Sequence, residues 1–143
     1  MKKLISVFTT IFALFFLASC TMQTKAPENV KRDWMLIEFQ NFTKQELANN
    51  KAHLDLSPKI ESGQFSANMG CNSMFGSANF NADASVKFSA IGSTMMFCDK
   101  AMDLESAFAK DLEKMTNYVV DGHYLTLSNS QGQKMKFVAA DWD

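Results

Sequence analysis

The chain has 143 residues, of which 47% are hydrophobic and 20% are charged, and these proportions are typical of one globular domain rather than a disordered or fibrous protein. Without the first twenty residues, which include Lys2 and Lys3, the net charge moves from -1 to -3. A mildly acidic chain lacks the clustered basic residues that bind a phosphate backbone, so we expect no nucleic-acid partner. Composition favours a small binding or structural module.

The first twenty residues have the pattern of an export signal. Lys2 and Lys3 precede an apolar run of 14 residues that ends at Leu17, and a membrane-spanning helix needs about 20. The run ends in Leu17-Ala18-Ser19-Cys20, which resembles the lipobox of bacterial lipoproteins, whose cysteine thiol receives diacylglycerol. The alternative is a plain secretory signal with an incidental cysteine.

Lipidation of Cys20 would anchor the protein without spanning the membrane, because two or more acyl chains hold a protein stably on a bilayer. The residue after the cysteine is Thr21. In Gram-negative bacteria, a lipoprotein without Asp at this position resembles those sent to the outer membrane. Residues 21–32 are polar and suit a flexible tether. We expect residues 33–143 to form one domain that faces the periplasm.

Short strand patterns dominate this domain. Apolar and polar residues alternate most clearly along Lys134-Met135-Lys136-Phe137, as a sheet with one buried face requires. An Asp121-Gly122 pair is typical of a two-residue hairpin turn, and that turn would place Tyr118 opposite Leu125. Strands are predicted at residues 34–39, 53–56, 64–69, 86–90, 118–120, 124–127 and 134–138.

One segment, residues 99–116, has a helical pattern. It contains no Gly or Pro, and Asp99 is placed to cap its first turn. A stripe of apolar residues at helical spacing would pack on the sheet; its members are Ala101, Leu104, Phe108, Leu112 and Met115. The predicted fold class is mainly β (α+β): a small, strongly curved antiparallel sheet or partial β-barrel with one packed helix.

Cys71 and Cys98 remain once Cys20 is assigned to the lipobox. In an exported chain, two such thiols most often form a disulfide, and this one would close a loop of about 28 residues and contribute on the order of 3 to 4 kcal/mol. Two separate buried thiols are the alternative. A soft-metal site for Cu(I) is a further alternative, because five methionines lie near these cysteines: Met69, Met74, Met95, Met96 and Met102.

Glu105 is the most informative charged residue. It lies on or beside the apolar stripe of the predicted helix, and no basic residue lies three or four positions away. We expect its carboxylate to accept hydrogen bonds from backbone amides or hydroxyls around Ser93 and Thr94; a ligand or acid/base role in a pocket is the alternative.

Motifs of common enzymes are absent from the sequence. It contains no GxSxG, glycine-rich phosphate loop or HExxH, and His53 and His123 are isolated residues on strand patterns. We therefore predict no catalytic residues, no cofactor and no resident metal.

The order of several short motifs resembles the META domain family, which includes the HslJ-type heat-shock lipoproteins. The motifs are Trp34-x-Leu36, Gly70-Cys71-Asn72-x-x-x-Gly76, Ser93-Thr94-Met95-Met96-x-Cys98, Glu105-x-x-Phe108-x-x-x-Leu112, Gly122-x-x-Leu125-x-Leu127 and Phe137. The resemblance implies a mostly β domain with one helix, and a fold similar to that of the lipid-binding pilotins. It implies no enzyme activity. Gly70, Asn72, Gly76, Ser93 and Thr94 are expected to be structural, with the glycines permitting tight backbone and Asn72 bonding its own turn.

Together these features predict a monomeric, non-enzymatic outer-membrane lipoprotein that acts as an envelope-stress accessory or binding module. Its expected partners are the membrane, through the lipidated N-terminus, and an envelope protein or hydrophobic ligand. A pilotin-like carrier that shelters an acyl chain or hydrophobic peptide in its curved sheet is the alternative function.

Overall fold

The computed structural model describes residues 27–58 and 63–142. The predicted export signal with Cys20 lies outside the described residues, as does the part of the predicted tether before Pro27. No helix within the described ranges is long and apolar enough to cross a bilayer.

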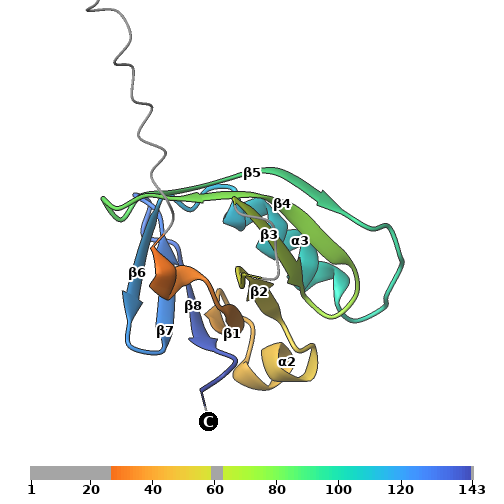
Figure 1. Ribbon diagram of the computed structural model, residues 1–143. Coiled ribbons are helices and arrows are strands. Elements are labelled where there is room, and N and C mark those ends of the chain that lie inside the picture. The colour runs from red at the N-terminus through yellow and green to blue at the C-terminus, as the bar shows by residue number, and fades with distance from the viewer. Residues whose placement is uncertain (1–26, 59–62, 143) are drawn as a thin grey trace, which may run out of the picture.

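Eight antiparallel strands form one strongly curled sheet (Figure 1), which confirms the predicted fold class. Their order across the sheet is β5-β4-β3-β2-β1-β8-β7-β6. The strands are β1 (Asp33–Phe39), β2 (His53–Asp55), β3 (Gln64–Asn68), β4 (Ser73–Phe80), β5 (Val86–Ser93), β6 (Asn117–Asp121), β7 (Tyr124–Ser128) and β8 (Lys134–Ala139). The helices are the short 3-10 helix η2 (Glu28–Val30), α2 (Lys44–Asn49) and α3 (Met102–Leu112).

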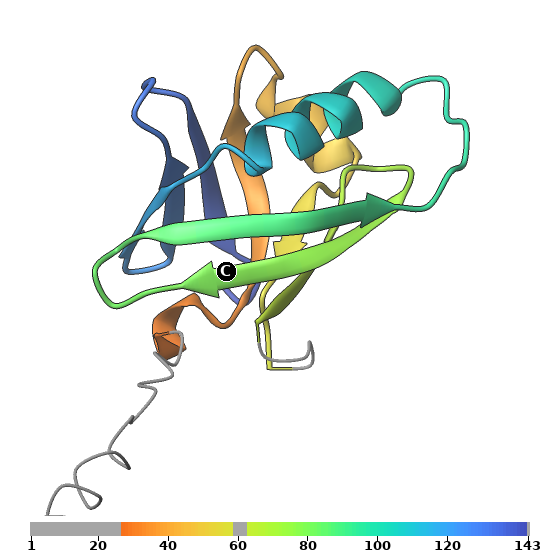
Figure 2. The ribbon, with the colours of Figure 1, turned by 90° about the horizontal axis from the view of Figure 1, so that it is seen from above.

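The two edge strands, β5 and β6, meet at one end and then diverge. Ser85 and Asn117 form an isolated bridge, and the Tyr118 amide donates to the Ala84 carbonyl at 3.0 Å. Beyond this contact the sheet stays open, and α3 lies along the concave side of β5 (Figure 2). The fold is therefore a partial barrel whose open side is covered by a helix.

The predicted apolar faces form one core. Met135 and Phe137 on β8 are fully buried while Lys136 is only half-buried, as the alternation predicted. The whole predicted helix stripe, from Ala101 to Met115, is buried as well. Phe108 of α3 packs edge-on against Phe39 of β1, with 6.1 Å between ring centroids. This core joins every strand to α3 and fixes the helix over the sheet.

Helix α3 is shorter than predicted. It spans Met102–Leu112 rather than residues 99–116, and its N-cap is Ala101, without a side-chain cap, rather than Asp99. Residues 99–101 instead form a turn between the disulfide at Cys98 and the start of the helix. At the other end, the Thr116 amide already pairs with the Ser128 carbonyl of β7.

Helix α2 was not predicted. Thr43 caps it through a reciprocal arrangement in which the Thr43 hydroxyl accepts from the Glu46 amide and the Glu46 carboxylate accepts from the Thr43 amide. A Thr-x-x-Glu sequence is the recognised signal for such a cap. The signal was present at residues 43–46 and would have identified this helix.

Two predictions about strands were wrong. Strand β4 was not predicted, because its sequence SMFGSANF has weak strand propensity. The strand nevertheless pairs on both sides, with β3 and with β5. The hairpin between β6 and β7 turns at Gly122 and His123, so Tyr118 lies opposite Leu127 rather than Leu125. Gly122 has a φ of 57°, which suits the first central position of the turn.

Candidate functional site

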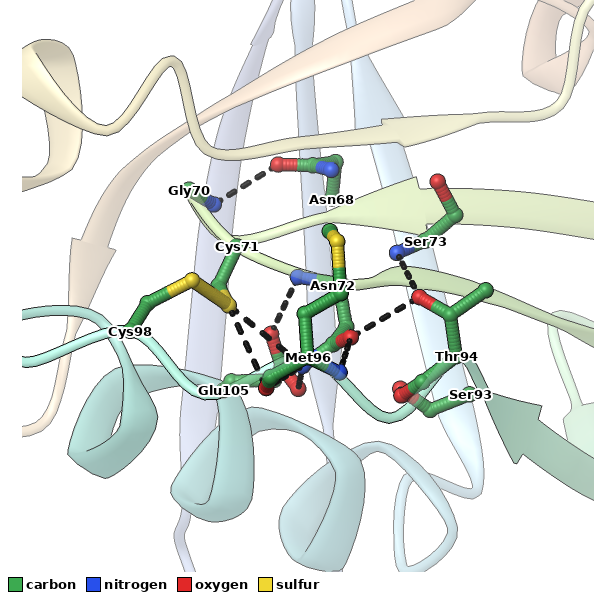
Figure 3. The surroundings of a disulfide bond; sticks show 10 residues. All are labelled: Asn68, Gly70, Cys71, Asn72, Ser73, Ser93, Thr94, Met96, Cys98 and Glu105. Atoms are coloured by element: carbon green, nitrogen blue, oxygen red, sulfur yellow. Dashed lines mark hydrogen bonds between the residues drawn. A yellow bond between two sulfur atoms is a disulfide. The ribbon is translucent and has the colours of Figure 1, made fainter.

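The side-chain amide of Asn72 is the centre of a buried polar cluster at the start of β4 (Figure 3). Its Oδ1 accepts from the Met96 amide at 2.7 Å and from the Thr94 hydroxyl at 2.8 Å. Its Nδ2 donates to the Met96 carbonyl at 3.0 Å and to Glu105 Oε1 at 2.8 Å. Asn72 is only 2% exposed, and these four bonds use both of its donors and both acceptor positions.

Glu105 joins this cluster from the first turn of α3. Its Oε2 accepts from the Asn72 backbone amide at 2.8 Å, while Oε1 accepts from the Asn72 side chain. The carboxylate is 7% exposed, and it lies near the helix N-terminus, where the helix dipole favours negative charge. The expectation of a hydrogen-bonded, buried Glu105 is therefore met, but the partner is Asn72 rather than Ser93 or Thr94.

A disulfide between Cys71 and Cys98 lies beside this cluster and is the pairing that the sequence predicted. The two Cα atoms are 6.0 Å apart. Cys71 immediately precedes Asn72 and Cys98 lies two residues after Met96. The disulfide and the Asn72 side-chain amide thus both fasten the loop of residues 94–98 to the chain at Cys71 and Asn72.

Thr94 fastens the beginning of that loop. Its amide donates to the Ser73 carbonyl at 3.1 Å, and its hydroxyl oxygen accepts from the Ser73 amide at 3.2 Å. Ser93 is exposed, and its hydroxyl donates to the Thr94 carbonyl at 2.9 Å. The Asn72 side chain bonds its own turn, as expected, only through a 3.5 Å contact from Nδ2 to Cys71 Sγ. Its shorter bonds connect the start of β4 to the loop and to α3.

The two motif glycines are required for different reasons. Gly70 has a φ of 110°, and a Cβ there would lie 2.6 Å from the Asn50 side chain at the end of α2. Gly76 has no left-handed backbone; a Cβ there would lie 2.9 Å from the carbonyl oxygen of Ser89 on β5. Gly76 faces a bulge in β5, where Ala90 adopts a φ of 53°. Close approach, rather than turn conformation, explains this second glycine.

The methionines near the cysteines do not gather into one site. Met69 and Met74 are buried in the core, whereas Met95 and Met96 are exposed. The sulfurs of both cysteines are held in the disulfide. Among the described residues, no group of three or more His, Cys, Asp and Glu side chains is placed to hold a metal ion. The geometry does not favour the copper alternative.

The two histidines are not part of the Asn72 cluster, and each contacts residues of its own surroundings. His53 Nδ1 is 2.9 Å from the carbonyl oxygen of Lys51. The His123 ring stacks on Trp142 with 3.5 Å between centroids. A catalytic histidine would contact a nucleophile such as Ser or Cys, and neither of these contacts is of that kind.

Asp111 on α3 is a second buried carboxylate, and it is not among the site residues predicted from the sequence. It accepts hydrogen bonds from Gln40 Nε2 at 2.7 Å, Lys114 Nζ at 2.7 Å and Gln133 Nε2 at 3.4 Å. These bonds connect α3 to the segment after β1 and to the turn before β8. Burial would raise the pKa of Asp111, but the bonds from Lys114 and Gln40, with the nearby charge of Lys110, hold it below its ordinary value.

Comparisons with known proteins agree with this geometry. A family model described as META domain matches residues 28–142. No curated protein matches the chain. Among solved structures, an NMR structure of a protein from Burkholderia xenovorans is 19% identical, with a TM-score of 0.60 and coverage of 78% of this chain and 83% of that one. A crystal structure of a DUF4847 family protein from Bacteroides vulgatus is 14% identical, with a TM-score of 0.54 and coverage of 79% and 95%. At such identities the likeness shows the fold alone.

Replacing Glu105 tests the role of the Asn72 cluster. In Glu105→Gln, one of the two carboxylate oxygens becomes an amino group that faces an Asn72 donor. We expect the free energy of unfolding to fall by about 1 to 3 kcal/mol, the range for a buried group left without a partner. Urea unfolding at neutral pH measures this, with Glu113→Gln on the exposed side of the same segment as the control. An unchanged midpoint would contradict a structural role and would point to a ligand at Glu105.

Replacing Asp111 tests the second carboxylate through pH. Asp111→Asn should lower the free energy of unfolding by about 1 to 3 kcal/mol at neutral pH. Because the folded pKa lies below the unfolded value of about 3.9, the contribution is fully present above the unfolded pKa and is lost as pH falls through the lower folded pKa. The difference between wild type and variant should therefore shrink below about pH 4. Urea unfolding across this range measures it, with exposed Asp121→Asn at the end of β6 as the control; a difference that stays constant in acid would refute the assignment.

Proposed function

Because this chain belongs to the META domain family, with a buried polar cluster that fixes a surface loop, we propose that it is a non-enzymatic outer-membrane lipoprotein acting as a binding module of the cell envelope. The observation that carries the non-enzymatic part is the Asn72 amide, whose hydrogen-bonding capacity is used within the fold. An active-site amide would keep a donor or an acceptor position for substrate. Here the Asn72 side chain has none left, and each oxygen of Glu105 accepts a hydrogen bond from Asn72.

The lipid anchor rests on the sequence Leu17-Ala18-Ser19-Cys20 and on the polar tether after it. Thr21 supports delivery to the outer membrane, with the domain facing the periplasm. A role as an envelope-stress accessory, as in the HslJ-type members of the family, is part of the same proposal. The tether would set the domain off from the membrane surface, where it can meet partners in the periplasm.

The carrier alternative is not favoured by the packing of the interior. The concave side of the sheet is occupied by large buried side chains, among them Trp34, Phe65, Phe88, Phe108 and Phe137. An acyl chain could enter only by displacing side chains that already pack at core density, which costs several kcal/mol for each large residue. Recognition is therefore expected at the surface of the domain.

Lipidation is tested by expressing the full chain in a Gram-negative host with labelled fatty acid. Wild type should carry the label and sediment with outer membranes, while Cys20→Ser should lose the label and be released from membranes. Ser19→Ala, which keeps a small residue before the cysteine, is the matched control and should remain labelled. Thr21→Asp should move the labelled protein to the inner membrane. Label retained in Cys20→Ser would overturn the anchor.

A further inference from the structure

Three consecutive large apolar residues are exposed at the loop that the Asn72 cluster holds. Met95 is 98% exposed, Met96 57% and Phe97 82%. Phe75, 55% exposed on β4, lies close to the same end of the sheet, since a Cβ on its neighbour Gly92 would be 2.8 Å from its ring. Single exposed apolar residues are ordinary, but a run of three at one place marks an interaction surface.

The backbone of this loop is fixed although its side chains are free. Asn72 binds both the amide and the carbonyl of Met96, the middle residue of the run. Thr94 before the run pairs with Ser73, and Cys98 after it is covalently bound to Cys71. A loop held at both ends and in the middle loses little conformational entropy when it binds, so its shape is prepared for a partner.

The charges beside the loop fit a protein partner better than a lipid surface. The next exposed charged residues along the chain are Asp99, Lys100 and Asp103, which together are acidic. Segments that dock on anionic lipid carry clusters of Lys and Arg instead. Methionine side chains adapt their shape and are common at surfaces that bind other proteins.

The loop of residues 95–97 lies at the end of the domain that would face away from the anchoring membrane. Both views place the loop after β5 and the helix η2, where the described chain begins, at opposite ends of the long strands β4 and β5 (Figures 1 and 2). If Cys20 is lipidated as proposed, the segment that leads to the lipid joins the end remote from the loop. This direction rests on the proposed function, whereas the exposure of the loop does not.

We infer that residues 95–97 dock into an apolar pocket on a second, different protein of the periplasm. The methionine and phenylalanine side chains enter the pocket, and the disulfide and Asn72 hold the loop in the shape that fits it. The domain core then serves as the support that carries this loop on a lipid anchor.

The test places the photo-reactive residue p-benzoylphenylalanine at position 97 of the full-length chain in Gram-negative cells. The control chain carries it at position 119, where Val119 is 60% exposed on β6. We expect one discrete adduct with a different protein from position 97 and not from position 119. That protein is then purified, and its affinity for wild type is compared with its affinity for Met95→Ser/Phe97→Ser and for Val119→Ser.

Loss of two apolar side chains that the partner would bury should weaken binding by about tenfold or more, while Val119→Ser should bind like wild type. The loop variant should keep the thermal midpoint of wild type, because both replaced side chains are exposed. Cys20→Ser protein should bind the purified partner equally well, so failure of the lipid anchor and failure of the docking inference give different results.

Four outcomes would overturn the inference. These are the absence of an adduct at position 97, an adduct between two copies of this chain, equal affinity of the loop variant, and loop-dependent sedimentation with vesicles of phosphatidylethanolamine and phosphatidylglycerol.

Discussion

The amide of Asn72 is the interaction on which the rest of the site depends. From the residue before β4, it bonds to the loop before α3 through Met96 and Thr94, and to α3 itself through Glu105. The orientation of the amide follows from its partners, because the Met96 N–H can only donate and the Met96 carbonyl can only accept. A side chain at position 72 that lacked either a donor or an acceptor would leave the Met96 carbonyl or the Met96 N–H without a partner. An unpaired polar group that is buried away from water lowers the free energy of unfolding.

Motifs that lie far apart in the sequence meet at this amide. Asn72, Thr94 and Glu105 belong to separate motifs, yet they form one hydrogen-bonded unit next to the disulfide. The unit divides the domain into two parts with different roles. The sheet and α3 supply stability through a closed apolar core, and the loop of residues 95–97 supplies exposed apolar side chains.

Much of this architecture could be predicted because it depends on local patterns. The buried stripe on α3 follows from helical spacing, the alternation on β8 from strand spacing, and the disulfide from the number of cysteines in a chain with the pattern of an export signal. The capping signal at Thr43 and Glu46 was equally local and was overlooked. Asp111 follows Ala107 and Phe108 at helical spacing, so its place beside the apolar stripe could also have been inferred.

Features that depend on contacts between distant segments could not be predicted. The sequence of β4 has weak strand propensity, and pairing with β3 and β5 decides its conformation. The partner of Glu105 is a residue 33 positions earlier, and nothing near either residue specifies that pairing. The same holds for Gln40, whose bond to Asp111 spans 71 positions. Strand register, likewise, is fixed by the turn geometry at Gly122 rather than by the Asp-Gly signal alone.

Amide hydrogen exchange at Met96 tests the central claim most directly. If Asn72 holds the loop, the Met96 amide should exchange slowly, like the amides of the paired strands, although the residue carries an exposed side chain. In Asn72→Ser, which shortens the side chain, protection at Met96 should be lost while amides in β1 and β8 remain protected. A Met96 amide that exchanges in wild type as fast as an unstructured peptide would contradict the account, because the loop would then not be held in place.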